Sequence, residues 1–236
     1  MVFVVLVYYV SQLLSGAVVS IYPGLRHWSP NQATNWLNNS VGAQFAYILI
    51  AEALAVGAIY WFLRRRRLGL SVIGLRRPKL SDPVYGLIAL PVYFFFLLAV
   101  VGIISRYVPG LNINQQQQIG FNDVHGAVQL SLTFISLVIL PPLAEEIMMR
   151  GFLYGSLRKV MRVVPAALIT SGLFAAAHLP EGGAAGPLYI AAIDTFILSL
   201  VLVYLREKTG GLWASITLHA LKNGIAFVAL FVIHAR

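Results

Sequence analysis

Long apolar segments, separated by short polar or turn-rich stretches, dominate this sequence of 236 residues. They cover residues 1 to about 21, and then about 43–63, 83–105, 124–160, 163–179, 187–205 and 212–233. A helix that crosses a hydrocarbon core about 30 Å thick needs about 20 apolar residues. Only 11% of the residues are charged, against roughly 25% in soluble domains. We therefore predict an all-α bundle of about seven membrane-spanning helices.

Most of the positive charges lie between these segments or at their ends, and Arg150 and Lys222 lie well inside them. Twelve of the 17 Lys and Arg residues fall in the stretches 64–79, 158–162 and 206–208, while Arg26, Arg106 and Arg236 fall on the opposite side. This distribution follows the positive-inside rule, so we expect a cytoplasmic N-terminus and the lipid bilayer as partner. A nucleic-acid partner is not expected despite the net charge of +9. The expected location is a prokaryotic cell membrane.

The chain is predicted to form a single integral membrane domain, residues 1–236, since nothing is left over for a sizeable soluble one. Residues 1–120 carry no marker of function, whereas 121–236 hold the polar residues considered next. Residues 22–42 are polar and turn-rich, which predicts an external loop. There are no cysteines, so disulfides, thiolate zinc sites and cysteine nucleophiles are excluded.

The most unusual feature is an acidic pair, Glu145 and Glu146, within apolar sequence. Carboxylates are costly inside a membrane, and the chain has only eight acidic residues. Glu146 and Arg150 are four apart, which favours an ion pair on one helical face. The preceding Pro141 and Pro142 have no N–H, so they leave carbonyls of the previous turn without a helical donor. The sequence thus predicts a local polar spot within the bilayer.

Two further pairs, Phe174 with His178 and His219 with Asn223, also have the spacing of one helical face. At 1.5 Å per residue, Glu145, His178, His219 and Asn223 lie roughly 16–24 Å from the basic ends of their spans. Three helices therefore carry them to similar depths. This holds if the helix after Pro142 continues to Arg158. If residues 148–162 lie along the interface instead, Glu145 moves toward the cytoplasmic surface.

Three motifs occur in order on separate spans: E-E-x-x-x-R at 145–150, F-x-x-x-H at 174–178 and H-x-x-x-N at 219–223. Together they resemble the CPBP family of CAAX proteases and bacteriocin-processing enzymes, which includes the type II CAAX prenyl endopeptidases. The resemblance covers roughly residues 130–227 and implies hydrolysis of a peptide bond in a peptide or protein substrate at the membrane.

The resemblance also implies roles for the motif residues. Glu145 matches the glutamate that activates water, and His178 matches its partner in holding that water. His219 and Asn223 match the pair proposed to stabilise the oxyanion. Three further residues match positions that shape the site: Glu146, Arg150 and Phe174.

Elementary chemistry agrees with such a site. A carboxylate in a low-dielectric environment is a competent general base. An imidazole and an amide four residues apart can each donate a hydrogen bond to one developing oxyanion, worth roughly 3–4 kcal/mol of barrier per donor. The chain has no G-x-S-x-G motif, and Asp194 is the only aspartate within an expected span. These absences argue against serine and paired-aspartate mechanisms.

A metal is the open question. Glu145, His178 and His219 could ligate Zn²⁺ with water in the fourth position. The chain has no H-E-x-x-H motif, however, and these ligands come singly from three helices. We expect no cofactor, with Zn²⁺ as the alternative.

Two other functions remain open besides the endopeptidase. The first is a non-catalytic membrane protein that keeps the protease fold and binds a peptide or confers immunity. The second is a small transporter with a proton path through Glu52, Asp194 and Glu145, although the chain lacks the repeat symmetry of such proteins. The oligomeric state is not assigned.

Overall fold

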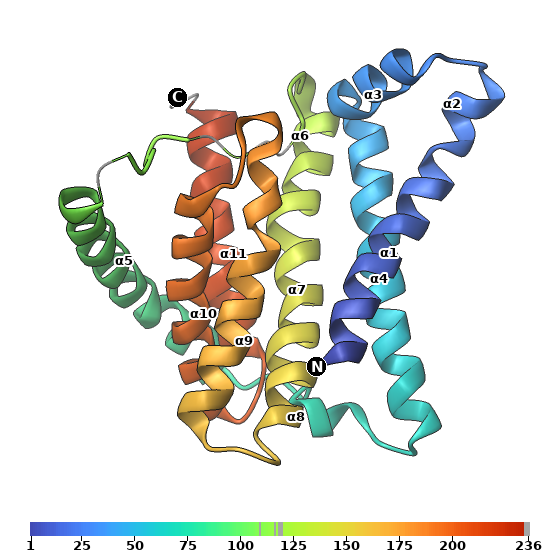
Figure 1. The fold of residues 1–236 in the computed structure, drawn as a ribbon. Helices are drawn as coiled ribbons and strands as arrows, with labels where there is room; N and C mark the ends of the chain where they lie inside the picture. The colour runs from blue at the N-terminus through green and yellow to red at the C-terminus, as the bar shows by residue number, and fades with distance from the viewer. Residues whose placement is uncertain (109, 116, 118–119, 234–236) are drawn as a thin grey trace. The chain divides into compact units, whose positions relative to one another are not determined.

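A computed structural model describes the chain except for residues 109, 116, 118–119 and 234–236 (Figure 1). The described part is all-α and contains no strand. It has seven helices long and apolar enough to cross a membrane: Val2–Leu25, Val41–Arg65, Ser81–Tyr107, Gly126–Leu157, Val163–Gly183, Tyr189–Thr209 and Trp213–Val232. The predicted fold class and the seven spans are confirmed. Arg236 and two glutamines of the 115–118 run lie outside the described residues.

The helices group into two compact units. Unit 1 comprises residues 1–69, 120–148 and 220–236, and unit 2 comprises 70–119 and 149–219. The fourth and seventh spans contribute residues to both units, because one boundary falls between Met148 and Met149 and another between His219 and Ala220.

Unit 1 begins with two spans that pack side by side, α1 (Val2–Val19) and α4 (Val41–Arg65) (Figure 1). Ser15 on α1 donates a hydrogen bond of 2.6 Å to the carbonyl oxygen of Tyr47 on α4. Ala51 and Ala55 of α4 are buried. Small side chains of this kind let helix backbones approach closely, as is typical of helix pairs in membranes.

The prediction of a loop over residues 22–42 is wrong. Two helices occupy most of it, α2 (Ile21–Leu25) and α3 (Pro30–Asn39). Ser29 accepts a hydrogen bond from the backbone of Gln32, whose side chain in turn accepts one from the Ser29 backbone. This capping box, with proline in the first helical position, is a strong start signal that the polar composition concealed.

One continuous helix runs from Gly126 to Leu157. It is built from α6 (Gly126–Phe134), a π-helical segment η2 (Ile135–Ile139), α7 (Leu140–Glu146), a second π-helical segment η3 (Ile147–Tyr154) and α8 (Gly155–Leu157). The expectation of an unbroken helix beyond Pro142 is confirmed as far as Leu157. Turns of π-helix occur frequently at functional sites.

Unit 2 contains most of the remaining elements: η1 (Leu70–Ile73), α5 (Ser81–Tyr107), α9 (Val163–Ala177), η4 (Leu179–Ala185), α10 (Tyr189–Thr209) and the first half of α11 (Trp213–Phe227). A π-helical segment η5 (Val228–Val232) follows α11 in unit 1. α5 starts two residues earlier than expected, so Asp82 lies in its first turn.

The core of unit 2 joins α5, α10 and α11 through buried side chains that include Tyr93, Leu202 and Leu218. The Tyr93 hydroxyl donates a hydrogen bond to Asp194 on α10, so this carboxylate has a partner within the core. Gly86 lets α5 approach α11, since an added Cβ there would lie 2.8 Å from Cβ of Thr217. Because glycine has no side chain, the backbones of the two helices can lie closer together at this contact.

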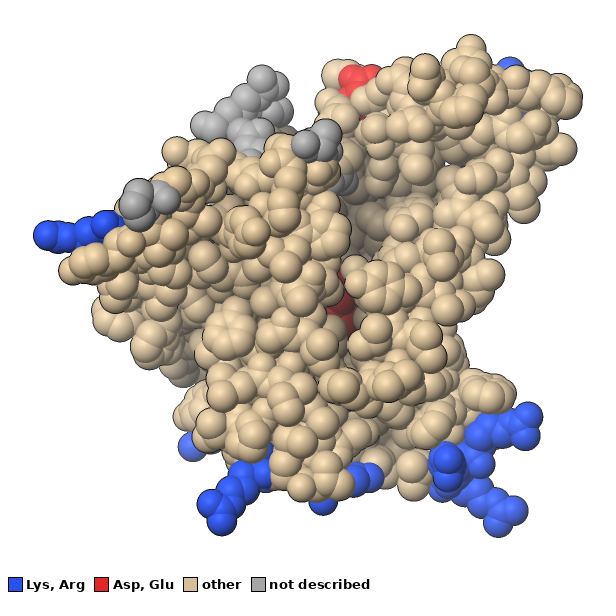
Figure 2. All heavy atoms as spheres, viewed as in Figure 1, with Lys and Arg blue, Asp and Glu red and all other residues tan. Residues whose placement is uncertain are grey.

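Much of the surface is apolar. Large side chains on the spans are widely exposed, among them Leu13 at 73% and Leu98 at 70%. Uncharged residues account for most of the face shown in Figure 2. An exposed apolar surface of this extent needs lipid to cover it, as in an integral membrane protein with several spans.

Candidate functional site

The two prolines before the acidic pair leave a backbone carbonyl without a helical donor, and a residue of α11 donates to it. Pro141 is four residues and Pro142 five residues after Leu137, so neither an α-helical nor a π-helical donor exists for the Leu137 carbonyl. Asn223 of α11 donates a hydrogen bond of 2.9 Å from Nδ2 to that carbonyl oxygen. The predicted unsatisfied carbonyl is therefore present, and a motif residue supplies its partner.

This bond lies within unit 1 and brings Asn223 against the helix that carries Glu145. A Cβ added at Gly224 would lie 3.7 Å from Cγ1 of Val138, which is an ordinary packing distance and indicates close contact between α11 and η2. Glu145 follows Leu137 by roughly 12 Å along the helix axis at 1.5 Å per residue. An amide has two N–H donors, so the bond to Leu137 leaves a second donor on Asn223.

The acidic pair itself lies at the end of α7. Glu146 is fully buried, whereas Glu145 is partly exposed. Arg150 follows in η3 on the same continuous helix and is also fully buried. The ion pair of Glu146 with Arg150 stays a prediction.

In unit 2, three polar motif residues meet around the ring of Phe174. The guanidinium carbon of Arg150 lies 4.5 Å from the ring centroid, a cation–π contact. The imidazole of His178 lies edge-on at 4.7 Å between ring centroids, and that of His219 at 6.0 Å. Phe174 is 2% exposed, so the cluster lies in the interior. Residues from η3, α9 and α11 thus share one buried aromatic ring.

His178 is held by the end of its own helix. It is the residue that follows α9, and its Nδ1 lies 2.8 Å from the carbonyl oxygen of Phe174. A carbonyl oxygen only accepts, so Nδ1 carries the proton. In the neutral imidazole the other nitrogen, Nε2, then presents a lone pair. His178 is therefore oriented to accept a hydrogen bond or a proton at Nε2.

Sequence reasoning missed the neighbour of that nitrogen. Oε1 of Glu181 lies 3.9 Å from Nε2 of His178. The other oxygen, Oε2, accepts a hydrogen bond of 2.8 Å from Nε2 of Gln117 in the loop before α6. The signal that was available is the spacing of three residues between His178 and Glu181, which places side chains next to each other.

No group of three or more His, Asp or Glu side chains that could hold a metal ion occurs among the residues that the structure describes. Sites for Zn²⁺ require three or four such ligands close together.

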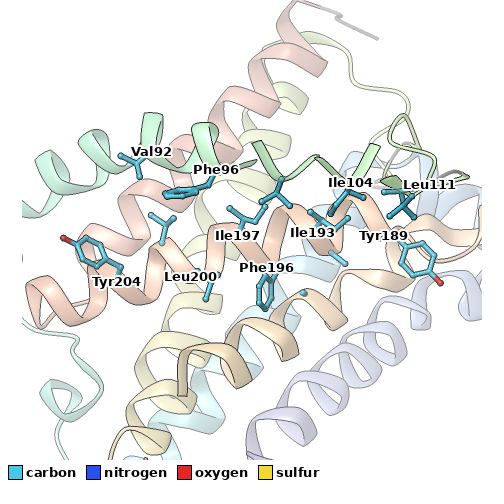
Figure 3. A pocket seen from close by; sticks show the side chains of 15 residues that line it. Val92, Phe96, Ile104, Leu111, Tyr189, Ile193, Phe196, Ile197, Leu200 and Tyr204 are labelled. Atoms are coloured by element: carbon cyan, nitrogen blue, oxygen red, sulfur yellow. The ribbon is translucent and has the colours of Figure 1, made fainter. Parts of the chain in front are cut away.

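An apolar groove of about 950 Å³ runs along α5, α9 and α10 in unit 2 (Figure 3). Its lining includes Phe96 and Ile104 of α5 and Ile197 of α10, with Tyr189 and Tyr204 at its opposite ends in Figure 3. Ala175, which directly follows Phe174, also lines it. The groove therefore passes beside the helix turn that holds the aromatic cluster.

The fold and the site define the class first: a multi-pass helical membrane protein with glutamate, arginine, histidine and asparagine side chains placed within its spans. Residues 127–225 match the family described as Type II CAAX prenyl endopeptidase, Rce1-like, so this segment is similar to that CAAX protease family. The matched segment contains all seven motif residues, and the resemblance seen in the sequence is confirmed. Among curated proteins and among solved structures, no significant match is found.

Proposed function

We propose that this protein is an intramembrane endopeptidase that hydrolyses a peptide bond of a membrane-associated peptide or protein. The observation that supports it most is the cluster around Phe174, where His178 and His219 of two different spans contact one buried ring. Structural packing alone gives no reason to place two imidazoles in an apolar interior, because each buried polar group has a desolvation cost.

In the proposed reaction Glu145 removes a proton from water while the oxygen of that water attacks the carbonyl carbon of the substrate. His178, with its proton fixed on Nδ1, accepts a hydrogen bond from the same water at Nε2. The carbonyl oxygen becomes an oxyanion, to which His219 and the second N–H of Asn223 donate. The tetrahedral intermediate then collapses, and the proton held by Glu145 passes to the leaving amine. No step requires a metal or a covalent nucleophile.

The apolar groove supports a substrate with a long apolar portion. Its lining side chains are apolar apart from the hydroxyl tips of two tyrosines, and it belongs to helices of the membrane-spanning part. A hydrocarbon chain or an apolar peptide segment fits such a lining, because it brings no polar group that would lose its hydrogen bonds there. A substrate that approaches within the bilayer fits this surface. The basic stretches favour a cytoplasmic N-terminus in the membrane.

The test is cleavage of a panel of fluorogenic peptides by the protein purified in detergent. Glu145→Gln keeps the shape of the side chain and removes the base, so kcat is expected to fall by about 10²–10⁴. His178→Ala is expected to lose activity in the same range. Glu52→Gln is the matched control, since it changes another glutamate within a span that lies outside residues 127–225.

Three outcomes contradict the proposal. Cleavage that survives both Glu145→Gln and His178→Ala rules out the assigned roles. A wild-type protein that binds peptides of the panel without cutting any supports the non-catalytic alternative. Proton-coupled transport in liposomes that disappears in Glu52→Gln supports the transporter.

A further inference from the structure

The segment that precedes α5 holds the turn between α10 and α11 through three hydrogen bonds. The carbonyl oxygen of Gly74 accepts a bond of 3.1 Å from the backbone N–H of Leu212. The carbonyl oxygen of Arg76 accepts a bond of 2.6 Å from the indole N–H of Trp213. In the other direction, Nη2 of Arg76 donates at 3.1 Å to the carbonyl oxygen of Thr209. One short segment therefore contacts the end of α10 and the start of α11 together.

The Arg76 side chain is itself fixed by a buried carboxylate. Its two terminal nitrogens donate to the two oxygens of Asp82 at 2.9 and 2.7 Å, and Asp82 is 1% exposed. The backbone N–H of Lys79 adds a third bond to Asp82, at 2.8 Å. The hydrogen bond with Asp82 raises the pKa of Arg76 above its ordinary value, so the guanidinium stays charged. Such a two-pronged pair fixes orientation as well as distance, which a lysine cannot reproduce.

The turn is shaped to receive this guanidinium. A Cβ added at Gly211 would lie 2.6 Å from Nε of Arg76 and 2.7 Å from Cζ, closer than real contacts permit. Only glycine leaves space for the planar group at that position. We call the set Arg76, Asp82, Thr209, Gly211 and Trp213 the Arg76 clamp.

The clamp acts at the first residue of the helix that carries His219. α11 begins at Trp213, and His219 follows by roughly 9 Å along the axis at 1.5 Å per residue. A helix is stiff over this length, so a change at its start moves the imidazole relative to Phe174. We propose that Arg76 is a positioning residue for His219, acting through Trp213 and Thr209. Arg76 lies outside residues 127–225, and its assignment rests on the proposed function.

The experiment compares four single variants of the full chain in detergent. Arg76→Lys keeps a positive charge beside Asp82 but loses the fork that also reaches Thr209. Trp213→Phe keeps an aromatic side chain of smaller volume and removes the donor to the Arg76 carbonyl. Arg77→Ala is the matched control, because Arg77 is next to Arg76 in sequence and its side chain is exposed. For Arg76→Lys and Trp213→Phe we expect kcat to fall about 10- to 100-fold with KM changed less than about threefold, as small misplacements of catalytic groups do.

Hydrogen–deuterium exchange gives a readout that does not depend on activity. Backbone amides near Leu212 and at the start of α11 are expected to exchange faster in Arg76→Lys and Trp213→Phe than in Arg77→Ala or the wild type. Methylguanidinium added to Arg76→Ala is expected to restore part of kcat, since it can occupy the site beside Asp82.

The outcomes separate the two proposals. Unchanged exchange in both variants overturns the clamp. Faster exchange with kcat equal to that of Arg77→Ala overturns the positioning role, while leaving the proposed function intact. If the two variants exchange faster but the wild-type protein cleaves no peptide, the proposed function is overturned, and the positioning role with it.

Discussion

The bond from Asn223 to the Leu137 carbonyl leads to a prediction about stability. Asn223→Leu keeps the approximate shape of the side chain and removes the donor. The Leu137 carbonyl then loses its partner in the membrane interior, because Pro141 and Pro142 have no N–H. Interhelical bonds in membranes average about 0.6 kcal/mol and reach about 1.7, and an orphaned buried group costs about 1–3. We expect the free energy of unfolding to fall by about 1–2 kcal/mol.

The same reasoning predicts that Pro141→Ala cancels most of this cost. An alanine at 141 has an N–H that can donate to the carbonyl four residues earlier, which is Leu137. In that background Asn223→Leu should cost less than about 0.5 kcal/mol. Pro91→Ala is the control, since Pro91 also lies inside a helix, α5, which does not contain Leu137. Its background should leave the cost of Asn223→Leu unchanged.

The assay is reversible unfolding in mixed detergent micelles by increasing SDS, followed by tryptophan fluorescence of the four tryptophans. The free energies of the single and double variants form a double-mutant cycle. An Asn223→Leu cost that is the same with proline or alanine at position 141 would refute the idea that Asn223 replaces a missing helical donor.

Further predictions concern packing, the aromatic cluster and metal. Gly86→Ala should destabilise by about 1–3 kcal/mol, since its Cβ would lie 2.8 Å from Thr217, while Gly102→Ala in the same helix, with open space around it, should stabilise by up to about 1. A lower SDS midpoint for Gly102→Ala than for Gly86→Ala would contradict this. Phe174→Leu should lower stability by about 1–2 kcal/mol through loss of the contact with Arg150, whereas Phe174→Trp should retain a ring face for the cation. Equal losses for both substitutions would exclude a cation–π contribution. Chelation with 1,10-phenanthroline should leave peptide cleavage unchanged, and activity that disappears and returns with Zn²⁺ would refute the metal-free mechanism.

Much of the fold follows from sequence because its determinants are local. Hydrocarbon thickness sets the length of each span, so hydropathy alone predicts the seven spans within a few residues. The polar spot after Leu137 is also local, since it depends only on the missing N–H groups of Pro141 and Pro142. Helix α3 also has a local determinant, since the capping box of Ser29 and Gln32 indicates a helix start within a stretch of polar composition.

The contacts that were not predicted are tertiary. The sequence predicts a pair of Arg150 with Glu146 on the same helix, because spacing identifies neighbours only along one helix. Its contact with Phe174 joins different spans, and no spacing rule reaches across them. The bonds from Arg76 to Asp82 and Thr209 are similar, since a run of basic residues between spans is most simply explained by topology.

The proposed hydrolysis within a bilayer needs a place where polar groups are stable, and the prolines before Glu145 supply a polar spot of this kind. A proline pair in a spanning helix is tolerated only where another group satisfies the released carbonyl or water reaches it. Here Asn223 satisfies it with one N–H and keeps a second, so one amide can serve both the helix and a developing oxyanion. Helix stability and the proposed reaction require different things of Asn223. The helix needs only one donor, whereas the reaction also needs the side chain held in place. Asn223→Gln retains both donors on a longer side chain, so it should preserve more stability than activity, and the reverse order would contradict the double role.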